Sequence, residues 1–414
     1  MKDGRPDVVV VGAGLAGLAC ALHLDEAGAT VRLLEATDGV GGRVRTDIVE
    51  GFRLDRGFQV LLTAYPETRR VLDSAALELR AFLPGALVRR AGRFHELTDP
   101  WRRPSRALAT LLSGIGTLGD RVRMARFRAR TRRGSLEELF RRPETSALER
   151  LRAEGFSEDM IESFFRPFFG GILLDLSLEV SSRMVEFVFR MMAEGDVAIP
   201  DAGMGQVPAQ MAARLPQGAL RFRARVSSVA PREVRLESGE ALDADAVVIA
   251  TEGPEAARLT GAFSAPASCS ATCVYFAAEQ APIAEPILLL DGDGSGPMNN
   301  LAFPSLVAPS LAPAGAVLVS ATVLDRRGTG LSVEDAVHEQ LAGWFGPMAH
   351  RWRHLRTYHI DHAQPDQRPG ALEPAERPVR LASGLFVCGD HRDTASIHGA
   401  MVSGRRAAEA VLSA

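Results

Sequence analysis

The stretch Asp7-Val8-Val9-Val10-Val11-Gly12-Ala13-Gly14-Leu15-Ala16-Gly17 decides the fold of this chain. An apolar strand runs directly into three glycines at G-x-G-x-x-G spacing. Gly12 permits a tight turn, Gly14 lets a pyrophosphate approach the backbone, and Gly17 lets a helix pack closely on the strand. The helix that starts at Leu15 and Ala16 offers free N–H groups and its positive dipole end to phosphates. The stretch therefore predicts a dinucleotide-binding unit.

The residues that follow complete this unit. A helical stretch reaches about residue 27, Gly28 is suited to end it, and a second strand over residues 30–34 leads to Glu35 and Ala36. Glu35 lies about 20 residues beyond the glycines, where a carboxylate accepts hydrogen bonds from ribose hydroxyls. Because strand, glycines, helix, second strand and acid occur in this order, the pattern is more specific than the glycine motif alone.

The N-terminus also carries a feature that resembles a secretion signal. Lys2 and Arg5 precede the apolar residues 8–24, but the glycines occupy fingerprint positions and no small-residue cleavage site leads into a separate domain. No apolar run reaches the roughly 18–20 residues of a membrane-spanning helix. We therefore expect a cytoplasmic protein, with peripheral membrane association as the open alternative.

Length and composition bound the function further. A chain of 414 residues exceeds one typical core, so two lobes are expected. The net charge of −3 gives no general attraction to nucleic acid. Lys2 is the only lysine, which excludes any mechanism that needs an interior lysine. The scattered cysteines and the segment 359–362, with its two histidines and one aspartate, lack the ligand spacing of a metal site, so no metal is predicted.

One internal segment is strongly basic. Residues 101–133 hold ten arginines and a single acid, Asp120, and the arginine groups flank the apolar residues 107–118. Basic flanks around an apolar stretch suit contact with an anionic membrane. A core helix followed by a solvated basic helix explains the same residues equally well. Nucleic-acid binding is not expected, because aromatic residues are not interleaved as stacking platforms.

The middle of the chain changes character twice. Residues 61–194 are predicted to be mainly helical, and the phenylalanines of 164–171 either wall an apolar pocket or pack in the core. Strand character returns at 220–226 and 245–251, with a hairpin turn expected at 237–240. Residues 292–297 resemble a phosphate loop, but the proline and the absence of a following helix indicate a turn.

Two further motifs concern phosphate and ring binding. Gly42 and Arg43 form a loop that can pass close to a diphosphate and hold it with a guanidinium. Near the C-terminus a strand over 385–388 ends in Gly389 and Asp390. A helix start at Gly399-Ala400-Met401 follows, where a carboxylate and helix N-terminus suit a polyol chain and an electron-rich ring edge.

Together, GAGLAG with Glu35, the GGRVRT loop at 41–46, the VVIAT strand at 247–251 and the terminal CGD and GAMVSG motifs resemble the FAD-dependent amine oxidase/phytoene desaturase superfamily, nearer its carotenoid desaturase and isomerase branch. The resemblance implies an α/β fold in which a Rossmann-like FAD-binding lobe, discontinuous in sequence, joins a mixed α+β substrate lobe. It assigns the segments 1–60, 195–258 and 366–414 to FAD binding, and 61–194 and 259–365 to the substrate lobe.

The resemblance also implies a role for each motif residue. The pyrophosphate would contact Gly12, Gly14, Leu15, Ala16 and Gly17, with Gly42 and Arg43 closing over it. The adenosine end would meet Glu35, Ala36 and the backbone of Val226. The ribityl chain or diphosphate would meet Gly389 and Asp390, and the flavin ring Gly57, Phe58, Gln59, residues 363–365, Gly399, Ala400 and Met401.

Catalytic residues are less sharply indicated. Gln59 and His398 are the candidates because both are expected beside the flavin ring, and His391 flanks the same edge. A hydrogen-bonded structural role explains each histidine as well. Arg166 is a candidate either to meet a substrate carboxylate or to cap the pocket mouth.

Departures from the family pattern shape the predicted chemistry. Many amine oxidases of the superfamily place a lysine, through a water, at flavin N5, and this chain has no such lysine. Only three Tyr and three Trp are available for an aromatic cage, and no cysteine stands where covalent attachment occurs. We predict noncovalent FAD, a hydrophobic and possibly isoprenoid-like substrate that loses hydride or is isomerised, and dioxygen or a quinone as acceptor. A flavin amine oxidase with an atypical lysine-free site and a non-catalytic FAD-binding protein are the alternatives.

Overall fold

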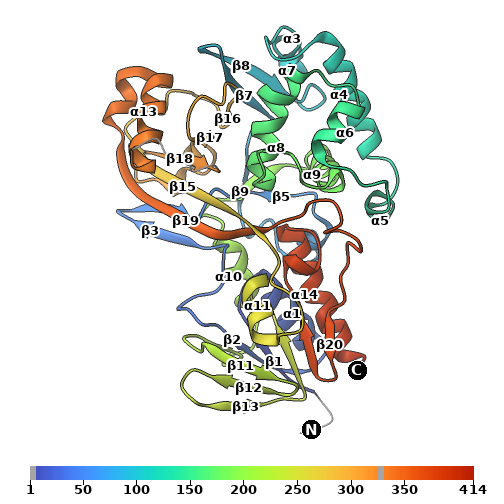
Figure 1. The fold of residues 1–414 in the computed structure, drawn as a ribbon. Coiled ribbons are helices and arrows are strands. Elements are labelled where there is room, and N and C mark those ends of the chain that lie inside the picture. The colour runs from blue at the N-terminus through green and yellow to red at the C-terminus, as the bar shows by residue number, and fades with distance from the viewer. Residues whose placement is uncertain (1–5, 325–330) are drawn as a thin grey trace.

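The computed structural model describes residues 6–324 and 331–414. The molecule is elongated, with a sheet that holds the first strand at one end and a group of helices at the other (Figure 1). The chain passes between these two ends several times, so each end is assembled from segments that are distant in the sequence.

A six-stranded sheet forms the end that carries the N-terminus. Its order is β10-β2-β1-β14-β21-β20, and all neighbours are parallel except β20 and β21. The strands are β1 Asp7–Val11, β2 Thr30–Leu34, β10 Leu220–Arg221, β14 Ala246–Ile249, β20 Arg380–Ala382 and β21 Leu385–Val387. The valines at 8–10 of the central strand β1 are completely buried, as an apolar run covered on both faces requires.

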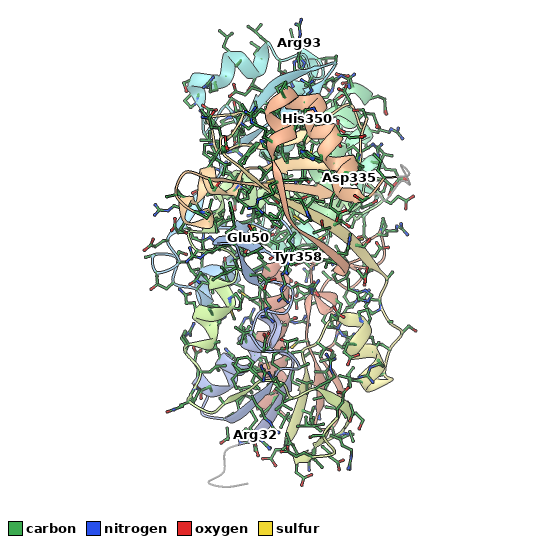
Figure 2. The ribbon with its side chains drawn as sticks, turned by 90° about the vertical axis from the view of Figure 1, so that its left-hand side faces the viewer. Arg32, Glu50, Arg93, Asp335, His350 and Tyr358 are labelled. Carbon is green, nitrogen blue, oxygen red and sulfur yellow. The ribbon has the colours of Figure 1, made fainter. Side chains whose placement is uncertain are left out.

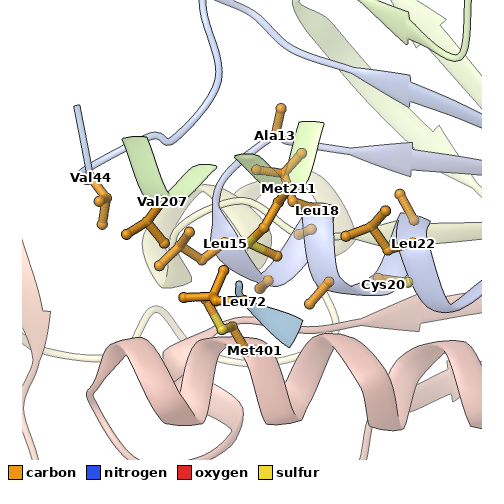
Figure 3. Packing of buried hydrophobic residues seen from close by; sticks show 14 of the residues in the cluster. Ala13, Leu15, Leu18, Cys20, Leu22, Val44, Leu72, Val207, Met211 and Met401 are labelled. Atoms are coloured by element: carbon orange, nitrogen blue, oxygen red, sulfur yellow. The ribbon is translucent and has the colours of Figure 1, made fainter. Parts of the chain in front are cut away.

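The two faces of this sheet are covered differently. Helices α1 (Leu15–Glu26) and α14 (Ile397–Leu412) lie together on one face, and a Cβ at Gly404 would lie 2.2 Å from the carbonyl oxygen of Ala16. Figure 3 shows the apolar core between them. On the other face lie α11 (Gly253–Thr260) and an antiparallel sheet of β11 Val226–Ala230, β12 Glu233–Leu236 and β13 Ala241–Asp243.

A seven-stranded sheet with the order β19-β15-β18-β17-β16-β7-β8 forms the middle of the molecule. Its strands are β7 Gly85–Arg90, β8 Arg93–Thr98, β15 Ser268–Ala278, β16 Leu288–Asp291, β17 Met298–Ala302, β18 Val317–Val323 and β19 Arg353–Pro365. Helix α13 (Val333–Phe345) packs against one side of it through a separate apolar cluster. Figure 2 shows the labelled Asp335 and His350 on this side of the molecule, with Tyr358 on the long strand β19.

Helices dominate from residue 104 to residue 194. They are η1 Pro104–Arg106, α3 Ala107–Leu111, α4 Leu118–Thr131, α5 Leu136–Phe140, α6 Ala147–Ala153, α7 Glu158–Met160, the π-helical η2 Ile161–Phe165, α8 Arg166–Leu173 and α9 Ser182–Glu194. The helical prediction for 61–194 thus holds for its larger part. Residues 61–98 instead hold four strands and one short helix, because their apolar residues alternate and pair with strands elsewhere.

Small elements join the larger layers. The two-stranded sheet pairs β3 Thr46–Val49 with β4 Phe52–Asp55, and a three-stranded sheet orders β5 Leu61–Leu62, β9 Val197–Pro200 and β6 Leu79–Ala81. The remaining helices are α2 Pro66–Val71, α10 Gln206–Ala212, α12 Pro304–Val307, η3 Pro309–Leu311, η4 Gly346–Arg351 and η5 Asp390–Arg392. Among the described residues no helix is both long and apolar enough to cross a membrane.

Several local predictions can be compared directly with these elements. The hairpin turn at 237–240 and the turn at 292–297 are confirmed, because each joins two antiparallel strands. The strand predicted over 220–226 is shorter than expected. Only residues 220–221 pair in the large sheet, and pairing resumes at Val226 in the three-stranded sheet.

Candidate functional site

The glycine turn between β1 and α1 combines two crowded glycines with an open one. Gly12 has φ +104°, and a Cβ there would lie 2.9 Å from the carbonyl oxygen of Ala250. A Cβ at Gly17 would lie 1.9 Å from the carbonyl oxygen of Gly12, so helix and turn are in direct contact. A Cβ at Gly14 would meet nothing within 4 Å. The backbone at Gly14 is therefore open to an approaching ligand.

Helix α1 begins at this open position. Its N-cap is Gly14, and no side chain caps it, so the first amides, at Leu15 and Ala16, keep their donors and the positive dipole end for another partner. Gly42 closes the same place from the other side, because a Cβ there would lie 3.6 Å from Cα of Gly14. The two glycine loops thus face each other, as a diphosphate site requires.

Glu35 is buried at the end of β2, with its half-buried neighbour Ala36 beside it. Its Oε2 accepts a hydrogen bond from the backbone amide of Ala13 at 2.9 Å, and its Oε1 accepts from the amide of Thr37 at 2.8 Å and from the Thr37 hydroxyl at 2.7 Å. These donors hold the carboxylate beside the glycine turn. The sequence analysis did not identify Thr37, although a threonine two residues after the acid is a local signal for such a contact.

Arg43 joins three segments that are far apart in the sequence. Its guanidinium donates to the carbonyl oxygen of Ala363 at 2.8 Å and to Oδ2 of Asp390 at 2.7 Å, and its own carbonyl accepts from Nε2 of Gln59 at 2.8 Å. A narrow cleft lies beside this arginine, lined also by residues of 252–254, 266–268 and 362–365. The structure therefore brings together the GGR loop, the residues expected beside the flavin ring and the carboxylate of the CGD motif.

The segment 57–59 approaches β19 closely and contains one buried hydrogen-bond acceptor without a partner among the described residues. Gly57 has φ +94°, and a Cβ there would lie 2.8 Å from Cδ1 of Ile360. Phe58 packs edge-to-face on Phe82, with ring centroids 5.9 Å apart. Oε1 of Gln59 is buried and has no hydrogen-bond partner within residues 6–324 and 331–414. A buried amide oxygen without a partner is costly unless a ligand N–H or water satisfies it.

The CGD motif lies at the carboxyl end of β21. Gly389 adopts φ +146° and its amide donates to Oγ of Ser403 at 2.9 Å. Asp390 is buried and paired with Arg43. Burial lowers the pKa of the neighbouring His391 to about 4, so this imidazole is neutral near pH 7. Neither of its ring nitrogens has a partner in the described part of the chain.

The C-terminal helix starts earlier than the sequence analysis predicted. Its N-cap is Ser396, whose hydroxyl accepts from the amide of Gly399 at 2.9 Å, and the amide of Ala400 donates to the carbonyl of Ser396. These amides are thus already used within the helix. Met401 is fully buried, and Figure 3 shows its side chain in the core beside Leu15. The positive end of the α14 dipole lies at residues 397–398. Ser396, a residue type typical of helix N-caps, is the signal in the sequence that the analysis did not use.

His398 sits in a stack of aromatic rings at this helix start. Its ring lies 5.5 Å from that of Tyr65 at an interplanar angle of 17°, and 5.7 Å from that of Phe187. Burial lowers the pKa of His398 to about 4. Its Nδ1 accepts from the backbone amide of Glu67 at 3.3 Å, which leaves the proton of the neutral ring on Nε2. His398 therefore acts as a hydrogen-bond donor rather than as a base.

Tyr65, like Phe187, is a residue of this stack that the sequence analysis did not identify. Its ring stacks on Phe187 with centroids 5.7 Å apart, and burial raises the pKa of its hydroxyl well above the ordinary value. The nearby carboxylate of Glu67 is neutralised by Arg405 at 2.8 Å. We call Tyr65, Phe187 and His398 the aromatic wall. It is uncharged at neutral pH, and its members Tyr65 and Phe187 are buried, whereas His398 is half-buried.

The remaining predicted residues lie elsewhere. Val226 is buried on β11 in the core cluster that also contains Leu34, so its backbone runs near the end of β2. Arg166 pairs with Glu162 at 2.6 Å and with the carbonyl of Leu176, which leaves it tied within the helical lobe. Across the part of the chain that the structure describes, no cluster of three metal-ligating side chains occurs.

Comparison with known proteins identifies the family. A family model described as flavin containing amine oxidoreductase matches residues 15–412. Putrescine oxidase from Kocuria rosea is 47% identical over 72 residues, which cover 17% of this chain and 15% of that protein. Coproporphyrinogen III oxidase from Mycobacterium tuberculosis is 27% identical over 285 residues, 60% of each chain. Phytoene dehydrogenase from Streptomyces griseus is 57% identical over 61 residues, which cover 15% of this chain and 12% of that protein.

The chain spans 60% or less of the length of these curated relatives. A solved oxidoreductase from Methanosarcina mazei superposes with a TM-score of 0.77 at 20% identity, covering 99% of this chain and all of that one. At this identity the likeness shows the fold alone. The predicted α/β architecture is confirmed, whereas the roles predicted for individual site residues stay predictions.

Proposed function

This chain belongs to the family of flavin containing amine oxidoreductases, and we propose that it removes hydride from a hydrophobic, isoprenoid-like substrate. Membership makes it an FAD-dependent oxidoreductase. The observation that carries the proposal of an apolar substrate is the uncharged aromatic wall of Tyr65, Phe187 and His398 at the start of α14.

The residues present fit FAD. The open backbone at Gly14, the uncapped start of α1 and the guanidinium of Arg43 suit a diphosphate. The unpaired Oε1 of Gln59 suits a ring N–H. These groups would hold the cofactor, with Glu35 at the ribose. When bound, FAD accepts the hydride and passes two electrons to dioxygen or a quinone.

The chain's own contribution is then to orient the substrate and exclude water. The half-buried ring of His398 would contact an apolar chain, and the buried rings of Tyr65 and Phe187 hold that ring in a defined plane. His398 donates from Nε2 and has no free lone pair in the ring plane, so it supplies a hydrogen bond and accepts no proton. The proton that leaves as a double bond forms is therefore not taken up by His398 and passes to solvent.

Amine oxidation is the second candidate, and a specific observation favours it: the short segment shared with putrescine oxidase. That segment carries less weight for substrate choice, because it covers only 17% of this chain. An ammonium group is bound by a carboxylate or by a π face, and the aromatic wall supplies a π face for either class of substrate. The carboxylate next to the aromatic wall, Glu67, is already paired with Arg405.

The test is anaerobic bleaching of the flavin by a panel of isoprenoid hydrocarbons, a reduced porphyrinogen, putrescine and aromatic amines. We expect bleaching by an isoprenoid, with a product lighter by two hydrogens. Turnover without net bleaching to a product of unchanged mass indicates isomerisation. Bleaching by amines alone, with aldehyde formation, would contradict the proposal in favour of the second candidate. Full flavin loading with no bleaching by any compound would favour a binding protein.

A further inference from the structure

More than half of the exposed large apolar side chains of the described residues come from one stretch of the sequence. Among the described residues ten such side chains are exposed, and six of them lie within 22 residues of sequence. We call these six the apolar tip: Trp101, Leu108, Leu111, Leu112, Leu118 and Val122. Leu112 is 74% exposed and Leu118 68% exposed. A contiguous exposed apolar patch marks an interaction surface rather than ordinary surface variation.

Five of the six residues of the apolar tip lie on or directly after two helices, α3 and α4. Leu108, Leu111 and Leu112 have i, i+3 and i+4 spacing on and just after α3, and Leu118 and Val122 have i, i+4 spacing at the start of α4. Residues at these spacings lie side by side on a helix. The two elements therefore each present one apolar side to solvent.

Polar contacts on the inner side hold this geometry. The buried Oγ1 of Thr110 accepts from the amide of Thr98 on β8 at 2.9 Å, and the amide of Gly114 donates to Nδ1 of His95 at 3.2 Å. Arg121 reaches back from α4 to Oγ of Ser113 at 2.6 Å. Because the opposite side is tied down by three separate contacts, the leucines are directed outward by the fold.

The apolar tip lies at one end of the long axis. Figure 1 places α3 and the start of α4 at the end opposite β1 and the N-terminus, and Figure 2 labels Arg93 at that end and Arg32 at the other. An apolar surface at the end of an elongated molecule can meet a flat surface without interference from the rest of the chain.

Most arginines around the apolar tip are paired with carboxylates, but two exposed ones are not paired within the described part of the chain. Several arginines of 101–133 are paired with acids from outside the segment, as Arg106 is with Glu285. Arg126 and Arg133 are exposed and have no carboxylate partner among the residues that the structure describes. Arg126 follows Val122 by one helical turn, about 6 Å farther along α4. The apolar face of α4 thus continues into a basic one.

We propose that the apolar tip docks this protein on the surface of an anionic lipid bilayer. The leucines of α3 enter the boundary between headgroups and acyl chains, and Arg126 lies at the level of the lipid phosphates. Apolar residues combined with adjacent unpaired arginines are the requirement for interfacial binding to such membranes. The proposal does not depend on the substrate, and it replaces the alternative in which this segment is only core and solvated helix.

The test is sedimentation of the purified holoprotein with vesicles of phosphatidylcholine alone or mixed with phosphatidylserine. We expect binding to the anionic vesicles that weakens with salt. Leu112→Asp should lower the partition coefficient about tenfold or more, since an inserted leucine is lost. The matched control is Ile48→Asp on the β3–β4 hairpin, because Ile48 is also 74% exposed, and it should bind like the wild type.

The arginine contribution is tested separately. Arg126→Gln should weaken binding to anionic vesicles about fivefold and leave binding to phosphatidylcholine unchanged, whereas Arg70→Gln, an exposed arginine on α2, should change neither. Trp101 provides a local readout as the fluorescence difference between the wild type and Trp101→Phe, because Trp344 and Trp352 also emit. This difference should shift to the blue on vesicles and be quenched by brominated lipid. Bound flavin and thermal unfolding show that each variant is folded.

Three results would overturn the proposal. The first is wild-type protein that stays in the supernatant at low salt. The second is a loss of binding in Ile48→Asp equal to that in Leu112→Asp. The third is a Trp101 fluorescence that does not change on vesicles. Sedimentation velocity without lipid tests the remaining alternative, that the apolar tip forms a dimer contact. If Leu112→Asp converts a dimer to a monomer while vesicles bind neither form, the apolar tip is a contact between two copies of this chain.

Discussion

A pair of substitutions three residues apart separates ligand binding from folding. Gly14 has φ −72° and ψ 178°, a backbone conformation open to any residue, and a Cβ there would meet nothing within 4 Å. Gly14→Val should therefore change the free energy of unfolding of the protein without flavin by no more than about 1 kcal/mol, the difference between good and poor N-cap residues. At Gly17 the same added carbon would lie 1.9 Å from a carbonyl oxygen.

The two variants should respond differently to FAD. A ligand present at a hundred times its dissociation constant stabilises the folded state by about 2.7 kcal/mol. Gly14→Val should lose this increment, because valine fills the space through which the pyrophosphate approaches the helix. Gly17→Ala should lower the stability of the flavin-free protein by about 1–3 kcal/mol or more, since backbone rather than a flexible side chain opposes the new methyl group.

Urea unfolding of each protein with and without added FAD, together with the flavin content after purification, measures both effects. The expected pattern is a stable, colourless Gly14→Val protein that FAD does not stabilise, and a destabilised Gly17→Ala protein that FAD still stabilises in part. A Gly14→Val protein with wild-type flavin content would refute the location of the phosphate site. Equal destabilisation of the two flavin-free variants would refute the packing argument.

Three further predictions concern buried charge. Arg43→Gln should lower the free energy of unfolding by about 1–3 kcal/mol, because the buried carboxylate of Asp390 loses its guanidinium; an equal loss in Asp390→Asn, which removes the charge, would contradict this. Burial raises the pKa of Asp55 to about 6, so this residue should lower the unfolding free energy by about 2–3 kcal/mol as pH rises from about 4 to 6. The measurement is the difference between wild type and Asp55→Asn in pH-dependent denaturation, which should change by that amount over this pH range. His398, whose pKa is lowered to about 4, should act oppositely, with its contribution to stability falling by about 2.5 kcal/mol as pH drops from about 6.5 to 4. His398→Gln should remove this contribution, and a pH profile equal to that of the wild type would show that the ring is not buried in solution.

The first nucleotide-binding unit could be predicted almost to the residue. The second strand is found at Thr30–Leu34, as expected, and α1 ends one residue before the predicted limit, at Glu26. This success has a local cause. Gly17 is required by its contact with Gly12, and Gly12 by its own φ of +104°, and such short-range constraints are written directly in the sequence.

The contacts that assemble the site could not be predicted in this way. Arg43 and Asp390 are separated by 347 positions, and nothing in either local sequence specifies that they pair. The aromatic wall likewise joins Tyr65, Phe187 and His398 from three elements. Hydrophobic periodicity predicts which face of a helix or strand is buried, but not which other element packs against that face. These contacts therefore follow only from the arrangement of the sheets.

Topology explains why the site lies where it does. In an open parallel sheet the strands' carboxyl ends share one edge, and ligands bind in the crevice outside it. Here β1 leads into α1 at Gly14, and β21 leads through Asp390 to α14 at Ser396. Both helices lie on the same face of the sheet, so their N-termini open toward one edge. Two positive dipole ends and Arg43 therefore converge there, which gives an anionic dinucleotide the most favourable electrostatic position on this sheet.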